Sequence, residues 1–149
     1  MMSKIFPTSY SKKSFNNKYG VPISLFNINK DDKIGIFEVG MDKKGEIDFL
    51  TKKIMPNVGV ITNISYAHIK NFQNIKGIAN AKSEIINNLV QHGSIVLNSD
   101  DKFFKFLKSK SIKKKLRIIS FGINKKSDVN LVNIKSGKFN SVNHIKYRW

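Results

Sequence analysis

Short apolar runs alternate along this chain with segments of helical periodicity, and this alternation constrains its fold more than any other feature. Apolar runs of five to eight residues, rich in isoleucine and valine, predict strands at 33–40, 58–65, 94–98 and 117–122, the first two of them buried. Segments of about ten to seventeen residues predict helices at 20–28, 45–55, 74–90 and 100–109. Strands that alternate with helices are typical of βαβ units, whose strands run parallel. The sequence therefore predicts an α/β fold, a partial and mostly parallel sheet with flanking helices.

The predicted helices show the expected spacing of apolar residues. In the helix predicted at 45–55, Ile47, Leu50 and Ile54 lie three and four positions apart. Acidic residues come early in this segment and lysines late, which suits the helix dipole. Lys82 lies among the apolar positions of the longest predicted helix. Its ordinary interpretation is a lysine whose stem packs on the apolar side while its amine reaches water.

The two ends of the chain differ from this pattern. The first 20 residues are polar and predict irregular structure. Residues 1–125 carry the alternation of strands and helices, whereas residues 126–149 predict an edge strand at 127–136 followed by a polar tail. We therefore expect one α/β domain that ends near residue 125.

Charge is the most unusual feature of the composition. The formal net charge is +17, which would suit an anionic partner such as a nucleic acid. However, Arg117 and Arg148 are the only arginines, and arginine is the residue that best forms paired contacts with phosphate and guanine. The lysines are also scattered along the chain. The sequence therefore favours a solvated lysine surface over a nucleic-acid interface.

The sequence also bears on compartment. It contains no cysteine, which excludes disulfides and thiolate metal sites. No apolar run approaches the roughly 20 residues that cross a bilayer. The first residues lack the apolar core of a secretory signal. We therefore expect a cytoplasmic protein without membrane insertion.

Polar residues at strand ends are the candidates for chemistry, because open parallel sheets bind ligands at the carboxyl ends of their strands. Glu38 ends the first predicted strand, and His68 follows the second. Asn98, Asp100 and Asp101 follow the third. Together they could hold a divalent cation and its nucleotide. Taken singly, each has an ordinary alternative: a surface carboxylate, a loop histidine, or an N-terminal helix cap.

Taken in order, five blocks of this sequence resemble the central domain of the Mur ligase family, and in particular its D-alanyl-D-alanine-adding branch. The resemblance runs from about residue 9 to residue 122. The blocks are FNNKYGVPISL (15–25), FEVGMDKKGEID (37–48), VGVITNISYAHIKNF (58–72), IANAKSEI (78–85) and SIVLNSDD (94–101).

This resemblance implies roles for individual residues. Glu38 and His68 would bind Mg²⁺, which offsets the charge of the transferring phosphate. Lys82 matches the lysine that Mur ligases carry as a carbamate, a change that turns a cation into an anion. Asn98 and Asp101 would lie near the adenosine of ATP. A final pair, Asn16 and Asn17, would face the nucleotide-sugar substrate.

The reaction that the resemblance implies is ATP-dependent amide synthesis in peptidoglycan assembly. ATP would phosphorylate the terminal carboxylate of UDP-N-acetylmuramoyl-tripeptide, and the amine of D-alanyl-D-alanine would attack the acyl phosphate. The family's ATP loop, G-x-x-G-K-[ST], belongs upstream of residues 15–25, and residues 1–20 contain no such segment. We therefore expect an incomplete ligase, without the family's C-terminal domain, that is inactive alone and exposes a sheet edge prone to association.

Three alternatives remain open at this point. The chain could derive from a neighbouring ligase, such as a folylpolyglutamate synthase or another Mur enzyme. It could be a small basic nucleic-acid-binding protein, supported by charge alone. It could also be a non-catalytic partner of a separate chain that carries the ATP loop.

Overall fold

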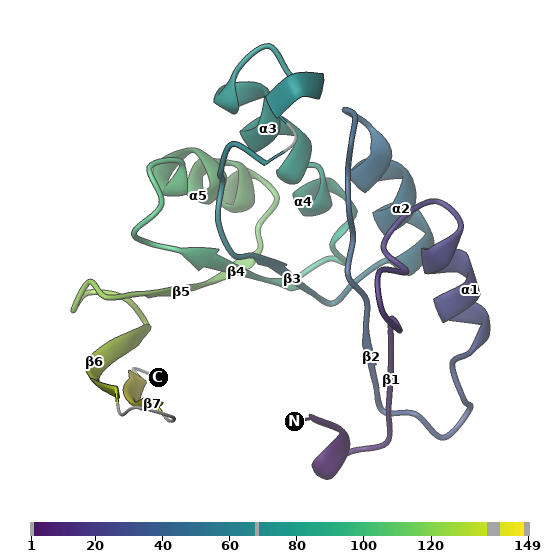
Figure 1. The fold of residues 1–149 in the computed structure, drawn as a ribbon, viewed down its shortest axis with the longest axis horizontal. Helices are drawn as coiled ribbons and strands as arrows, with labels where there is room; N and C mark the ends of the chain where they lie inside the picture. The colour runs from purple at the N-terminus through teal and green to yellow at the C-terminus, as the bar shows by residue number, and fades with distance from the viewer. Residues whose placement is uncertain (1, 68, 137–140, 148–149) are drawn as a thin grey trace. The chain divides into compact units, whose positions relative to one another are not determined.

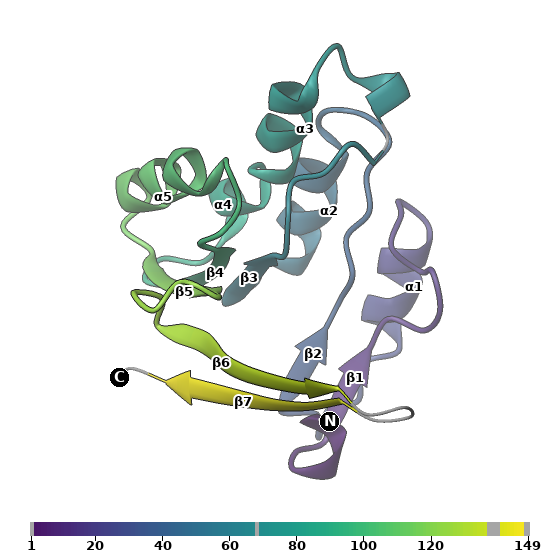
Figure 2. The same ribbon diagram turned by 60° about the vertical axis from the view of Figure 1, so that its left-hand side comes forward.

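The computed structural model describes residues 2–67, 69–136 and 141–147, and it divides into two compact units (Figures 1 and 2). The first comprises residues 2–55 and 69–88, and the second comprises 56–67 and 89 to the end of the described chain. Each unit combines helices with a mostly parallel sheet, so the predicted α/β class is confirmed. Among the described residues, no helix is both long and apolar enough to cross a bilayer.

The first unit contains a small parallel sheet and most of the helices. Strands β1 and β2 pair in register from Thr8 with Ile34 to Tyr10 with Ile36. The buried side chains of this unit come mainly from α2 and α3. Its elements are η1 (Met2–Lys4), β1 (Thr8–Tyr10), α1 (Gly20–Phe26), β2 (Ile34–Ile36), α2 (Glu46–Ile54), η2 (Ile69–Asn71), α3 (Ile75–Lys82) and α4 (Ile85–Asn88).

The second unit is built on a five-stranded sheet in the order β3-β4-β5-β6-β7. The first four strands are parallel, and β7 pairs antiparallel with β6. Helix α5 packs on β4 and β5, and Leu107, Ile95 and Leu97 of these elements are buried in the core. The elements are β3 (Val58–Ile61), β4 (Ser94–Asn98), α5 (Phe104–Lys113), β5 (Arg117–Gly122), β6 (Val129–Ser136) and β7 (Ser141–Tyr147).

Several strand predictions need correction. The first 20 residues include a strand, β1, in a stretch expected to be irregular. The predicted strand 33–40 shortens to β2, which is not buried because it pairs with β1 alone among the described strands. Strand β3 buries alternate residues because it lies at one end of its sheet. Strand β6 is not an edge strand, since β7 lies on its other side, within residues that were expected to form a polar tail.

Two helix predictions also need correction. The helix predicted at 74–90 breaks into α3 and α4 at Ser83. The Ser83 hydroxyl donates to the Asn80 carbonyl at 2.6 Å, and the Glu84 N–H turns back to the Ala81 carbonyl. Such side-chain bonds compete with the regular helical ladder. The last predicted helix begins later than expected, at Phe104, because residues around Asp101 form a turn before it.

The Asp128 carboxylate, just before β6, is hydrogen-bonded to Ser120 in β5. Asp128 Oδ2 accepts hydrogen bonds from the Ser120 hydroxyl at 2.6 Å and from the Ser120 N–H at 2.7 Å. The Asp128 N–H in turn donates to the Ser120 hydroxyl at 3.0 Å. These bonds, first the hydroxyl and then the N–H, lower the pKa of Asp128 below its ordinary value.

We expect Asp128→Ala to destabilise the chain by about 1–2 kcal/mol near neutral pH, because the Ser120 N–H and hydroxyl lose their acceptor. A carboxylate with a lowered folded-state pKa stabilises the fold above its unfolded pKa, about 4, and loses that contribution as pH falls through the folded pKa. The stability gap between wild type and variant should therefore close on acidification from about pH 7 to about pH 2.5. Urea denaturation at both pH values measures it, and a gap that stays constant would contradict this role.

Candidate functional site

Glu38 lies just past the end of β2 and is held from two directions. Its N–H donates to the Ser11 hydroxyl at 3.3 Å, and Ser11 itself extends the pairing with β2 through the Ile36 carbonyl. The side-chain Oε1 accepts a hydrogen bond from Asn16 Nδ2 at 2.9 Å. The side chain is exposed to solvent, and its second oxygen accepts no hydrogen bond from another described residue. A carboxylate so placed is oriented yet open to a ligand.

Asn16 and Asn17 occupy different positions in the first unit. Asn16 contacts the Glu38 loop twice, through its side chain and through its carbonyl, which accepts from the Gly40 N–H at 2.7 Å. Asn17 lies just before helix α1, and its Oδ1 accepts hydrogen bonds from the N–H groups of residues 19 and 20 at the start of that helix. Gly20 is needed there, since a Cβ would collide with the Phe15 backbone. That both asparagines face a nucleotide sugar stays a prediction.

An open hollow of about 460 Å³ lies beside Glu38. It is lined by the paired strands of the small sheet and by the segments around them: Met2, Ser3, Thr8, Tyr10, Ser11, Ile36 and Glu38. Hydroxyl groups and a carboxylate share this wall with apolar side chains. The hollow therefore offers Glu38 a polar approach from one side.

Lys82 is the last residue of α3 and is half-buried. Apolar neighbours on its helix, Ile78, Ala79 and Ala81, are buried. This placement matches the predicted position of Lys82 among apolar residues, whereas its chemical state stays a prediction.

Asn98 and Asp101 are brought together at the carboxyl end of β4 in the second unit. Asn98 Nδ2 donates to the Thr62 carbonyl at 3.1 Å, just beyond β3. Asp101 Oδ2 accepts from the Ile64 N–H at 2.6 Å, and its Oδ1 accepts from the Phe103 N–H at 2.8 Å. Both residues therefore join the segment after β3 to the turn before α5. Contact of either residue with a nucleotide stays a prediction.

Asp100 has a structural role at the same strand end. Its Oδ2 accepts from the Ile123 N–H at 2.7 Å, just past β5. A Cβ on Gly122 would collide with Asp100 and with Ser99, so β5 ends in close contact with this turn because residue 122 has no side chain. The Asp100-Asp101 pair thus fastens two neighbouring segments to β4.

Of the two predicted metal ligands, Glu38 lies among the described residues and His68 lies outside them. Within the described residues, no three histidine, aspartate or glutamate side chains gather as a metal centre would require. Mg²⁺ is commonly held by only one or two carboxylates together with water and substrate phosphates. Glu38, with an exposed carboxylate oriented by Asn16, fits that mode of binding.

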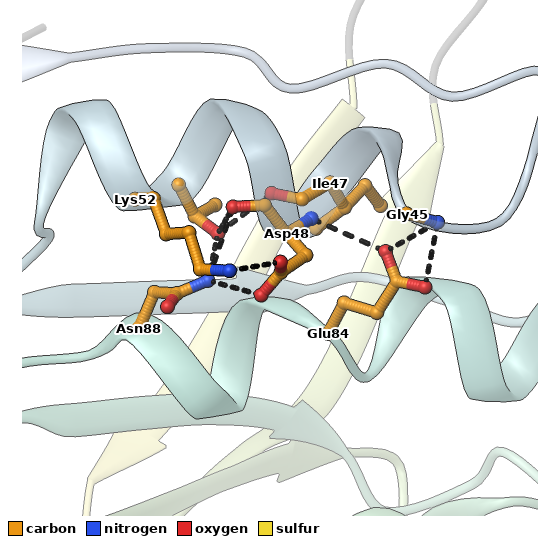
Figure 3. A network of polar contacts seen from close by, with 7 residues as sticks. Gly45, Ile47, Asp48, Lys52, Glu84 and Asn88 are labelled. Carbon is orange, nitrogen blue, oxygen red and sulfur yellow. Dashed lines mark hydrogen bonds and ion pairs between the residues drawn. The ribbon is translucent and has the colours of Figure 1, made fainter.

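Sequence reasoning missed the polar network that surrounds the start of α2 (Figure 3). Glu84 accepts hydrogen bonds from the N–H groups of Gly45 and Asp48, and Asn88 donates to Asp48 and Thr51. Lys52 forms an ion pair with Asp48 at 2.6 Å. These bonds with Lys52, and then Asn88, lower the pKa of Asp48. Glu84 and Asn88 lie 36 to 40 residues from their partners in sequence, so no local pattern predicts these contacts.

Comparison with known proteins places these residues in a family. Residues 1–148 match the Mur ligase middle domain. The chain is 35% identical over 122 residues to the UDP-N-acetylmuramoyl-tripeptide--D-alanyl-D-alanine ligase of Buchnera aphidicola subsp. Baizongia pistaciae, which covers 82% of this chain and 26% of that protein. The chain thus spans about a quarter of the length of this curated relative.

Two solved structures are similar in fold. The chain matches the crystal structure of MurF from Acinetobacter baumannii with a TM-score of 0.91 at 29% identity, over 98% of this chain and 31% of that one. It also matches MurF ligase from Thermotoga maritima, solved in complex with ADP, with a TM-score of 0.83 at 22% identity, over 98% of this chain and 33% of that one.

We expect Asp101→Ala to lower the free energy of unfolding by about 1–3 kcal/mol, because it leaves the Ile64 and Phe103 N–H groups without their acceptor. Hydrogen exchange at the Ile64 amide should accelerate together with the loss measured by urea denaturation. Asp31→Ala is the matched control, since it removes an exposed carboxylate that accepts no hydrogen bond from another described residue. Equal stability of the two variants would contradict the anchoring role of Asp101.

Proposed function

Since this chain belongs to the Mur ligase family, as its middle domain, we propose that it is the ATP-handling part of a ligase that adds D-alanyl-D-alanine to UDP-N-acetylmuramoyl-tripeptide. One observation carries this proposal: the Asn16 side chain and carbonyl contact Glu38 and Gly40. These contacts join the segments FNNKYGVP and FEVG, whose contacting residues Asn16 and Glu38 lie 22 positions apart in sequence. Two stretches that resemble the family's site motifs thus meet in space.

Glu38 is the group that would hold Mg²⁺, through the oxygen that Asn16 leaves open. His68 is the proposed second ligand. The cation would offset the charge on the phosphates of ATP, which activates the substrate carboxylate toward amide formation. The chain's own contribution there is orientation, because Ser11 and Asn16 fix the backbone and side chain of Glu38.

Lys82 in the first unit and the β4 turn in the second carry the remaining proposed roles. Lys82 is the proposed carbamate, an anion that would support a second cation. Asn98 and Asp101 are the proposed neighbours of the adenosine. The oxygens of Asp101 already accept backbone N–H groups, but each carboxylate oxygen has two lone pairs, so Asp101 can accept a further hydroxyl. We further propose that the protein acts in the cytoplasm, where its nucleotide-sugar substrate would be found.

Lysine chemistry weighs against a nucleic-acid-binding function. Several lysines lie over aromatic rings of their own chain. Lys102 Nζ lies 5.5 Å from the centre of the Tyr66 ring, and Lys53 Nζ lies 4.7 Å from the centre of the Phe49 ring. These contacts agree with a solvated lysine surface rather than a basic nucleic-acid interface.

A segment exchange tests the proposed function. We expect activity when this chain replaces the matching segment of the A. baumannii ligase, measured as release of ADP that requires both substrates. Glu38→Gln in the exchanged protein should lower kcat by about 100-fold or more, because the cation loses a ligand. Asp31→Ala, which removes a carboxylate of similar exposure, should leave kcat unchanged. A folded exchange protein in which both variants are equally active would exclude the assigned role of Glu38.

The chain by itself should not ligate. No G-x-x-G-K-[ST] segment occurs in the 149 residues, and such a loop supplies the backbone N–H groups and the lysine that hold phosphates. We expect no ADP release above background from purified chain with MgATP and both substrates. Ligation by the chain alone would overturn this expectation, and the exchange protein under identical conditions serves as the positive control.

A further inference from the structure

Glu84 connects two segments that carry proposed site residues. Its Oε1 accepts a hydrogen bond from the Gly45 N–H at 2.8 Å. Its Oε2 accepts from the Asp48 N–H at 3.1 Å and also lies 3.1 Å from the Gly45 nitrogen. Figure 3 shows the Glu84 carboxylate directed at the start of α2 from the break between α3 and α4. Gly45 follows Glu38 by seven residues, and Glu84 follows Lys82 by two.

The start of α2 depends on this remote carboxylate. The first N–H groups of a helix have no partner within the helix, and a side chain at the N-cap normally accepts one of them. Here the N-cap is Gly45, which has no side chain and adopts a left-handed φ of 91°. Glu84 therefore accepts from the N-cap and from the third helical residue, the two N–H groups that a local capping box would satisfy.

A second link to α2 lies four residues further along the chain, at Asn88 in α4. Asn88 Nδ2 donates to Asp48 Oδ1 at 2.9 Å and to Thr51 Oγ1 at 2.9 Å. Glu84 and Asn88 are four residues apart, a spacing that places two side chains on one face of a helix. Asn88 therefore fastens α4 to α2 without touching the loop that leads back to Glu38, and it provides a natural control.

The loop between Glu38 and α2 is thus fixed at both of its ends. Asn16 holds Glu38 and Gly40 at one end, and Glu84 holds Gly45 at the other. Glu46 orders the turn between them, because its carboxylate accepts from the N–H groups of Asp42 and Lys43. These two bonds lower the pKa of Glu46.

We propose that Glu84 is a positioning residue that sets the placement of the Glu38 loop relative to the helix that carries Lys82. This inference rests on the proposed function, which makes Glu38 a cation ligand and Lys82 a carbamate. Glu84 itself touches neither ATP nor substrate in this proposal. It acts by holding the loop that follows Glu38 against the break between α3 and α4.

Spin labels measure this placement without reference to metal or activity. Since the chain has no cysteine, Lys44→Cys and Lys76→Cys introduce two unique label sites, both exposed, on the loop and on α3. Double electron–electron resonance should give one narrow distance distribution in the otherwise unchanged chain. Glu84→Ala should broaden it at least twofold, whereas Asn88→Ala should leave it narrow. Glu84→Gln keeps one acceptor oxygen, so it should give an intermediate width, and it replaces Glu84→Ala if that variant fails to fold.

Mn²⁺ binding by the unlabelled chain reports on the site itself. We expect Glu84→Ala to raise the Kd for Mn²⁺ about tenfold, the usual effect of losing a group that orients a ligand, and Asn88→Ala to leave it unchanged. If no form of the chain binds Mn²⁺, the metal assignment in the proposed function is wrong, while the label distances still decide the role of Glu84. The positioning role would be overturned if the Glu84→Ala and Asn88→Ala variants gave equal distributions of the distance between the two labels, whether broadened or unchanged.

Discussion

Backbone amides, rather than lysines, are the partners on which the carboxylates of this chain depend. The chain has ten acidic and 27 basic side chains, yet the one ion pair between described residues joins Asp48 to Lys52. Six of the ten carboxylates accept backbone N–H groups: Asp32, Glu46, Glu84, Asp100, Asp101 and Asp128. Exposed ion pairs contribute little in water, whereas a backbone N–H without an acceptor is costly. The acidic residues therefore order turns and helix starts, and most of the positive charge is left on a solvated surface.

Local periodicity allowed much of this fold to be predicted. The helix around Ile47 and Leu50 and the strand at 94–98 are confirmed, because their apolar spacing reflects burial in the core. The α/β class is confirmed for the same reason. The strand at 117–122 is also confirmed, although its residues are only partly buried or exposed. The positions of Glu38 and Asn98 near strand ends also follow from sequence, since each comes directly after an apolar run.

The features that sequence could not supply depend on particular hydrogen bonds rather than on apolar spacing. Apolar spacing continues unbroken through Ser83, so nothing in the pattern indicates that its hydroxyl would end α3. Strand β7 has a polar sequence and is defined by backbone pairing with β6. In the sequence pattern, Glu84 cannot be distinguished from an exposed acid on a helix, and its hydrogen bond with Gly45 exists only in the folded chain. Propensity and periodicity describe what a segment prefers alone, whereas strand β7 and the contact of Glu84 with Gly45 depend on other segments of the chain.

Glu38 differs from the other strand-end acids in the kind of bond that it makes. Asp101 joins the segment after β3 to the turn before α5, and both of its oxygens accept backbone N–H groups that would otherwise be unsatisfied. Glu38 accepts from a side chain, that of Asn16, at an exposed position. Removing the Asp101 carboxylate therefore disturbs the fold, whereas removing that of Glu38 leaves the backbone satisfied. A carboxylate that is oriented but not required by the backbone is free for a cation, so structure separates two acids that the sequence placed in equivalent positions.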